Sequence, residues 1–205
     1  IMKDDIQSQI GAAPANNPEY QIDRFRLVYS SLITPNSVID YHFDTHEWEL
    51  KKQDEIPSGH HPADYVTERL HATAPDGTHV PMSVVYKKGL EKNGRNPTLL
   101  YGYGSYGANI EAGFSANRFS LIERGFVFVI GHIRGGSDMG RAWYEGGRLF
   151  NKRNSFTDFI ACAEYLIAAG YTSQDKLAIM GGSAGGLLVG ACLTLRPDLY
   201  KAVVA

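Results

Sequence analysis

The sequence predicts an α/β protein in which antiparallel strands come first and alternating strands and helices follow. Before residue 66, apolar and polar residues alternate at period two, which is typical of antiparallel strands. After it, continuous apolar runs alternate with segments of helical periodicity, which predicts parallel strands joined by helices. Seventeen of the 22 glycines lie between positions 102 and 190, so tight turns should concentrate there. We therefore divide the chain into residues 1–66 and residues 67–205.

The first part carries three short alternating runs, at residues 25–29, 39–43 and 48–50. Three strands are too few to bury both faces of a sheet. They indicate a piece of a larger sheet or one blade of a β-propeller. Residues 52–64, which contain Pro57, Gly59 and Pro62, are expected to be a linker.

The second part begins with a hairpin, because residues 68–72 and 80–86 flank the turn signal Pro75-Asp76-Gly77. Buried strands of the kind found in parallel sheets are then expected at residues 98–101, 126–130, 177–180 and 202–205.

Two helices are predicted between and after these strands. The first covers residues 156–167, with Ser155 as its N-cap and Gly170 just beyond its end. The second covers residues 184–195 and is stopped by Arg196-Pro197.

Composition limits the partners. Twenty basic and 22 acidic residues give a net charge of −2, so we expect no nucleic acid and no anionic membrane surface as partner. The uncharged run at residues 177–195 is broken by five glycines, which argues against a membrane span. Cys162 and Cys192 lie in apolar helical segments, and residues 1–5 carry no signal-peptide pattern, so we expect a cytoplasmic protein.

The segment Gly181-Gly182-Ser183-Ala184-Gly185 lies directly between a predicted strand and a predicted helix, as the nucleophile-elbow hypothesis requires. Such a turn raises the serine Oγ above the sheet and brings Gly181 and Gly185 into contact, so both must be very small. The N–H of Ala184 would point to the place where a tetrahedral oxyanion forms. The alternative is a chance match in a glycine-rich chain, and the strand and helix in register favour catalysis.

Residues 102–107 match the dinucleotide pattern G-x-G-x-x-G after a strand. No helix signal follows in residues 108–114, and the next strand ends in Gly131-His132 rather than in an acidic residue. We favour a loop on the rim of the sheet, in which Tyr103 is a candidate second donor to the oxyanion.

The other polar candidates favour structural roles. His132 lies on the same rim as Ser183, and a buried structural histidine is favoured over a local catalytic role. His42 and His46 are interpreted as surface groups, so we expect neither a metal nor a cofactor. Arg134 could bind an anion, but cross-linking of loops is favoured because three acidic residues lie near it in sequence: Asp138, Glu145 and Asp158.

Residues 101–107, 132–136, 143–147 and 181–186, in this order and spacing, resemble the prolyl oligopeptidase family of serine peptidases. The resemblance runs from about Thr67 to the last residue. Its oligopeptidase B branch is favoured by Ala184 after the serine and by Ser105-Tyr106 after Gly104.

This resemblance implies the N-terminal part of an α/β-hydrolase domain, preceded in residues 1–66 by the end of a seven-bladed propeller. It implies that Ser183 is the nucleophile, that the Tyr103 hydroxyl and the Ala184 N–H form the oxyanion hole, and that Tyr106 lines the substrate cleft. The implied reaction is hydrolysis of short peptides after basic residues through an acyl-enzyme. An esterase or acyl-aminoacyl peptidase on the same fold is the alternative.

Two members of the triad, the base and the orienting acid, are not found in this chain. In α/β-hydrolases the triad order is Ser, then Asp or Glu, then His, yet all seven histidines precede Ser183. We expect the acid and the base beyond Ala205 in a longer peptidase, and the 205-residue segment alone to be inactive. A non-catalytic scaffold with an orphan serine is the alternative, and the sequence does not indicate an oligomeric state.

Overall fold

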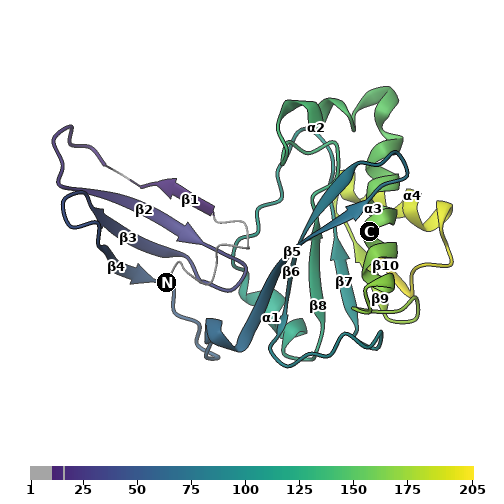
Figure 1. Ribbon diagram of the computed structural model, residues 1–205, viewed down its shortest axis with the longest axis horizontal. Helices are drawn as coiled ribbons and strands as arrows, with labels where there is room; N and C mark the ends of the chain where they lie inside the picture. The colour runs from purple at the N-terminus through teal and green to yellow at the C-terminus, as the bar shows by residue number, and fades with distance from the viewer. Residues whose placement is uncertain (1–10, 16) are drawn as a thin grey trace.

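The computed structural model describes residues 11–15 and 17–205, so the N-terminal residues inspected for a signal pattern lie outside the described residues. The chain forms two sheets, which lie apart in Figure 1. The smaller sheet is antiparallel, in the order β1-β2-β3-β4. Its last three strands confirm the three predicted ones, and β1 is an addition. The bounds are β1 Gly11–Pro14, β2 Arg24–Ser30, β3 Ser37–His42 and β4 Trp48–Gln53.

The larger sheet is mixed and has the order β10-β9-β7-β8-β6-β5. β5 and β6 form the predicted antiparallel hairpin, and β7, β8, β9 and β10 pair in parallel as predicted. The predicted division between residues 66 and 67 falls inside β5, because this strand already begins at Tyr65. The bounds are β5 Tyr65–Thr73, β6 His79–Lys87, β7 Thr98–Tyr101, β8 Val127–Gly131, β9 Leu177–Met180 and β10 Ala202–Val204.

Both predicted helices are present, as α3 and α4, and two short ones, α1 and α2, were not predicted. The N-cap prediction for Ser155 is wrong, because α3 begins at Arg153 and Lys152 is its N-cap residue. A 3₁₀ turn over Leu149–Asn151 runs almost directly into α3, so the helix starts earlier than the apolar periodicity indicates. The bounds are α1 Ala116–Ile122, α2 Arg141–Glu145, α3 Arg153–Ala168 and α4 Ala184–Leu195, with a further 3₁₀ turn at Pro62–Asp64.

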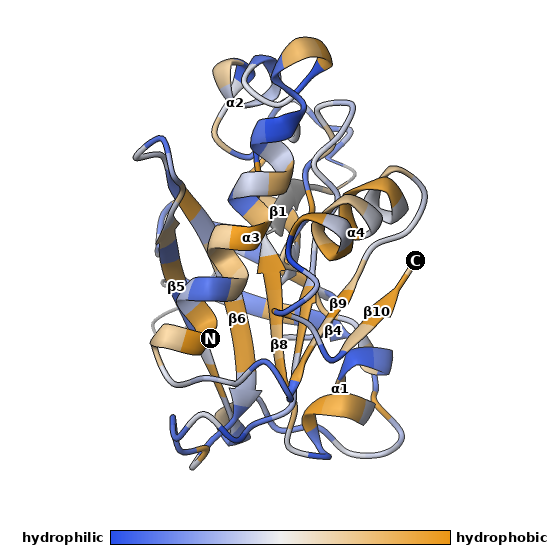
Figure 2. Ribbon diagram, turned by 90° about the vertical axis from the view of Figure 1, so that its right-hand side faces the viewer, coloured by the Kyte–Doolittle hydropathy of each residue, from blue (hydrophilic) through white to orange (hydrophobic). Residues whose placement is uncertain are grey.

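The larger sheet is covered on both faces, and its strands are mostly apolar in Figure 2. One core joins the sheet to α3 and α4, and the second joins its other face to α1. Leu32 and Ile33, from the loop after β2, pack into this second core, so the smaller sheet is anchored on the larger one. All five residues of β8 are buried, as expected of a strand covered on both faces.

This topology places three loops at one edge of the sheet, because the carboxyl ends of parallel strands meet there. Tyr101 at the end of β7 pairs with Met180 at the end of β9, and the N–H of Gly102 donates to the Met180 carbonyl (3.3 Å). The loops after β7, β8 and β9 therefore begin side by side on the rim where α/β folds hold their sites. None of the helices in residues 11–15 and 17–205 combines the length and the apolar character that a membrane span requires.

Candidate active site

Ser183 occupies the sharp turn between β9 and α4. Its backbone angles are φ 57° and ψ −119°, a conformation that L-residues rarely adopt, and its side chain is exposed. A backbone in so sparse a region costs about 1–3 kcal/mol and persists only where the surrounding structure enforces it. The structure thus holds the Ser183 hydroxyl out of the helix at the rim of the sheet.

Gly181 and Gly185 make this turn possible. A Cβ atom on Gly181 would lie 2.3 Å from the Gly185 carbonyl oxygen, and one on Gly185 would lie 2.9 Å from the Gly102 carbonyl oxygen. Real Cβ atoms do not approach that closely, so both positions require glycine. The N–H of Gly181 donates to the Val204 carbonyl (3.0 Å), which fixes the start of the turn to β10.

The first turn of α4 leaves a backbone donor near Ser183. The N–H of Gly185 donates to the Gly182 carbonyl (2.8 Å) and that of Gly186 to the Ser183 carbonyl (2.9 Å). Ala184 is the first residue of the helix, and a first-turn N–H has no acceptor within its own helix. Such a group, at the positive end of the helix dipole, suits a developing negative charge.

Tyr103 lies beside this turn. The Cβ position of Gly185 is 3.6 Å from Cδ2 of the Tyr103 ring, which is half-buried. Tyr106 has φ 59° and is 80% exposed, and its ring centroid lies 6.4 Å from that of Tyr103. A pocket of about 360 Å³ lies next to them and is lined by Tyr106, Ala184 and Leu187, among others.

The loop that carries Tyr103 rests on the loop after β8. The N–H of Gly107 donates to the Gly135 carbonyl (2.9 Å). A Cβ atom on Gly135, whose φ is 100°, would lie only 2.0 Å from the Gly104 carbonyl oxygen. Backbone packs directly on backbone here, so a shift of one loop must move the other.

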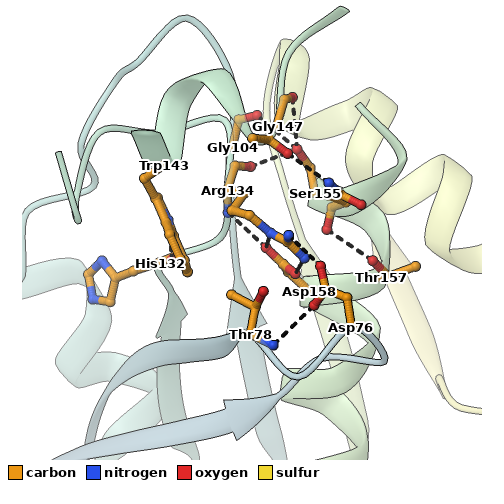
Figure 3. A network of polar contacts seen from close by, with 12 residues as sticks. Asp76, Thr78, Gly104, His132, Arg134, Trp143, Gly147, Ser155, Thr157 and Asp158 are labelled. Atoms are coloured by element: carbon orange, nitrogen blue, oxygen red, sulfur yellow. Dashed lines mark hydrogen bonds and ion pairs between the residues drawn. The ribbon is translucent and has the colours of Figure 1, made fainter. Parts of the chain in front are cut away.

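Arg134 cross-links these loops to α3, which confirms the structural role predicted for it (Figure 3). Its Nε donates to Asp158 Oδ2 (2.9 Å) and its Nη2 to Asp158 Oδ1 (2.6 Å), both buried. Its Nη1 donates to Asp76 Oδ2 (2.6 Å), and this guanidinium lowers the pKa of Asp76 to about 2. Of the three predicted partners, only Asp158 binds Arg134, and Asp76 was not expected.

His132 has both ring nitrogens engaged. Nδ1 lies 3.0 Å from Asp138 Oδ1 and Nε2 lies 2.8 Å from Ser83 Oγ. Burial lowers the pKa of the imidazole, and Ser83 is only 1% exposed. This array has the connectivity of a Ser-His-Asp triad, but no substrate can reach the buried serine. The preference for a structural histidine is therefore confirmed, and His132 is not available as a base for Ser183.

The comparisons with known proteins agree with this arrangement. A profile of the prolyl oligopeptidase family matches residues 112–205. Dipeptidyl aminopeptidase BI of Pseudoxanthomonas mexicana is 46% identical over 92% of the chain, and protease 2 of Moraxella lacunata is 43% identical over 94%. The chain belongs to the prolyl oligopeptidase family. It spans 26% and 28% of the length of these two relatives.

Solved structures of this family have the same fold. Oligopeptidase B from Leishmania major superposes with a TM-score of 0.86 and 46% identity, over 96% of this chain and 28% of that one. Oligopeptidase B from Trypanosoma brucei, with covalently bound antipain, superposes with a TM-score of 0.86 and 45% identity, over 95% of this chain and 28% of that one. The predicted α/β-hydrolase fold is thereby shown.

Sequence reasoning missed Lys152, a polar residue of the candidate site. Lys152 lines the pocket beside Ala184 and donates from Nζ to the Gly104 carbonyl (2.5 Å). A lone lysine ahead of a helix usually points into solvent, so the sequence carries no signal for this contact.

Among the described residues, no group of three histidine, cysteine or acidic side chains could hold a metal ion.

Proposed function

We propose that this chain carries the nucleophile and the oxyanion-binding part of a serine peptidase active site. The observation that carries the proposal is the backbone of Ser183, which is held at φ 57° between a parallel strand and a 12-residue helix. Strain of this kind is retained where it serves chemistry. Membership of a family of serine peptidases supports the same assignment.

In the proposed reaction, Ser183 Oγ attacks the carbonyl carbon of the scissile peptide bond. The serine proton passes to a base and then to the leaving amine, and water later hydrolyses the acyl-enzyme. The N–H of Ala184 and the hydroxyl of Tyr103 donate to the oxyanion of the tetrahedral intermediate. We propose that the base and its acid belong to the part of the full-length protein that follows Ala205, since His132 is bound to Ser83 and Asp138.

The proposed substrates are short peptides cut after arginine or lysine, with Tyr106 lining the cleft. Support comes from similarity to oligopeptidase B, whose Trypanosoma brucei structure holds antipain covalently. A dipeptidyl aminopeptidase is equally similar, so the mode of cleavage needs its own assay. Arginyl, prolyl and free dipeptidyl substrates and an acyl ester, compared side by side, separate the peptidases from an esterase.

Residues 1–66 are proposed to be the end of a β-propeller that restricts access to the site. Four antiparallel strands in sequential order are the make-up of one propeller blade, and β1-β2-β3-β4 has that order.

A fluorophosphonate probe tests the nucleophile in the full-length protein, with the adduct located by mass spectrometry. We expect a single adduct on Ser183, no adduct in Ser183→Ala, and normal labelling in Ser58→Ala, which removes another exposed serine. Labelling that persists in folded Ser183→Ala would contradict the assignment.

A further inference from the structure

Lys152 is a half-buried cation without an acidic partner. It lies at the N-cap of α3 and lines the same pocket as Tyr106 and Ala184. Its three hydrogen-bond partners are all neutral: the Gly104 carbonyl (2.5 Å), Ser105 Oγ (2.8 Å) and Ser155 Oγ (3.3 Å). Nζ also lies over the Phe156 ring, 5.9 Å from its centroid. No ion pair of Lys152 occurs among the described residues. Burial lowers the pKa of this ammonium group.

A buried charge is costly when no opposite charge accompanies it. Arg134, in the same network, has two carboxylates, and Arg148, on the same pocket, has Glu145. Lys152 therefore differs from its neighbours, because its desolvation is offset by hydrogen bonds to uncharged groups and by the Phe156 ring rather than by a carboxylate. An arrangement of this kind favours negative charge that develops nearby during a reaction.

Two of the three hydrogen bonds of Lys152 go to Gly104 and Ser105, the residues that join Tyr103 to Tyr106. Gly104 has φ 65°, so this short segment turns sharply, and Lys152 binds both its carbonyl and the Ser105 hydroxyl. Ser155 also approaches the Gly104 carbonyl (3.4 Å), whereas the Ser105 hydroxyl is bound by Lys152. Lys152 thus adds a charged anchor to a segment that backbone hydrogen bonds from Gly107 to Gly135 and from Ala108 to Ser105 also hold.

We propose that Lys152 is a positioning residue for the oxyanion hole, holding the turn at Gly104-Ser105 so that Tyr103 faces the elbow and adding positive charge to that side of the pocket. This inference rests on the proposed function, because it assigns Lys152 a role toward the oxyanion that Tyr103 and Ala184 bind. The hydrogen bonds of Lys152 go to Gly104, Ser105 and Ser155 and not to Ser183 or Ala184, so its effect passes through Tyr103 and through its charge.

The test is a double-mutant cycle in the full-length enzyme, measured as kcat and KM on an arginyl peptide substrate. Lys152→Met should lower kcat about 10–100-fold with KM nearly unchanged, since transition-state stabilisation alone is lost. In a Tyr103→Phe background the same change should have a much smaller effect, because residues that act together are non-additive. Lys176→Met, which removes an exposed lysine before β9, is the matched control and should leave both constants unchanged.

Ser105→Ala keeps the charge and removes one acceptor, so it tests the turn if Lys152→Met folds poorly. We expect it to lower kcat by a few-fold with unchanged thermal stability, and Lys152→Gln to lower it more than Ser105→Ala. If Lys152→Met lowers kcat by the same factor in the wild-type and Tyr103→Phe backgrounds, the lysine is merely structural and the inference is overturned.

Failure of the inference is distinct from failure of the proposed function. If Tyr103→Phe and Ser183→Ala impair the enzyme while folded Lys152→Met does not, only the role of Lys152 is wrong. If Ser183→Ala retains full activity, the proposed function itself is wrong.

Discussion

Ser183 and its neighbours show how close contact and backbone strain support each other at the scale of single residues. The turn places the Gly181 Cα hydrogen against the Gly185 carbonyl, where a Cβ would be 2.3 Å away. This contact leaves Ser183 no ordinary backbone conformation, and its hydroxyl stays exposed as a result. The same requirement explains why the residue pattern around the serine can be recognised in sequence at all.

Tyr103→Phe tests the second oxyanion donor. If the hydroxyl donates only as charge develops on the substrate oxygen, kcat in the full-length enzyme should fall about 10²–10³-fold, or roughly 2.7–4 kcal/mol, with KM nearly unchanged. Steady-state kinetics on an arginyl peptide measures this. An increase in KM alone would make Tyr103 a substrate-binding residue instead.

Gly181→Val or Gly185→Val should act on folding rather than on catalysis. The new side chain would overlap the Gly185 carbonyl or the Gly102 carbonyl, both of which are backbone and cannot move aside cheaply. We expect poor soluble yield and a lowered Tm by circular dichroism. Gly190→Val, in the same helix with open space around its Cβ position, is the control and should be tolerated. A stable Gly181→Val protein with reduced kcat would contradict this.

At the scale of elements, the strands and long helices followed from apolar periodicity, whereas the contacts between loops did not. The predicted positions of β7, β8, β9 and β10 are correct to within a residue or two because each is a short continuous apolar run, although β10 itself is largely exposed. α1 and α2 have only seven and five residues, too few for a helical period to emerge. The start of α3 was misplaced because Ser155 is a good N-cap residue by type, yet it is buried inside the helix.

Side-chain partners that lie on different loops are brought together by the tertiary fold. Short sequence patterns therefore do not predict them. Arg134 was expected to cross-link loops, but Asp76, 58 residues away, could not be found by proximity in the chain. Lys152 was missed for the same reason, since its contacts with Gly104 and Ser105 span 48 and 47 residues. Ser183 could be predicted from the sequence because its motif is contained in five consecutive residues.

His132, which ties the loop after β8 to β6 through Ser83, predicts a pH dependence of stability. Burial lowers its pKa in the folded chain below the ordinary 6.5, although the carboxylate of Asp138 opposes this and nearby Arg69 adds to it. The unfolded chain thus binds the proton more readily, so the stabilisation is complete above pH 6.5 and is lost as the pH falls through the folded pKa.

Denaturant titrations between about pH 7.5 and 5.5 measure this dependence as a slope of the unfolding free energy. The slope should shrink in His132→Gln and stay unchanged in His71→Gln, which removes an exposed histidine on β5. An unaltered slope in His132→Gln would show that other groups carry the dependence.

At the scale of the whole molecule, the described fold brings the proposed nucleophile and the proposed oxyanion donors to one rim, but among the described residues no histidine is free there to act as their base. All seven histidines precede Ser183 in the sequence. The one on the rim, His132, points its two ring nitrogens at Ser83 and Asp138. The order of strands explains the separation, because His132 follows β8, and β7 lies between β8 and the elbow strand β9.

The 205-residue chain by itself should therefore show no significant peptidase activity. A serine hydroxyl is a weak nucleophile until a neighbouring base takes its proton, and enzymes that lack a triad member keep only about 10³–10⁴-fold acceleration over water. The purified chain, with folding confirmed by circular dichroism, is assayed on an arginyl peptide beside the full-length protein. Turnover comparable to that of the full-length protein, abolished by His132→Ala without loss of folding, would mean that His132 leaves Ser83 and reaches Ser183. That result would move the base from the downstream region to the loop after β8.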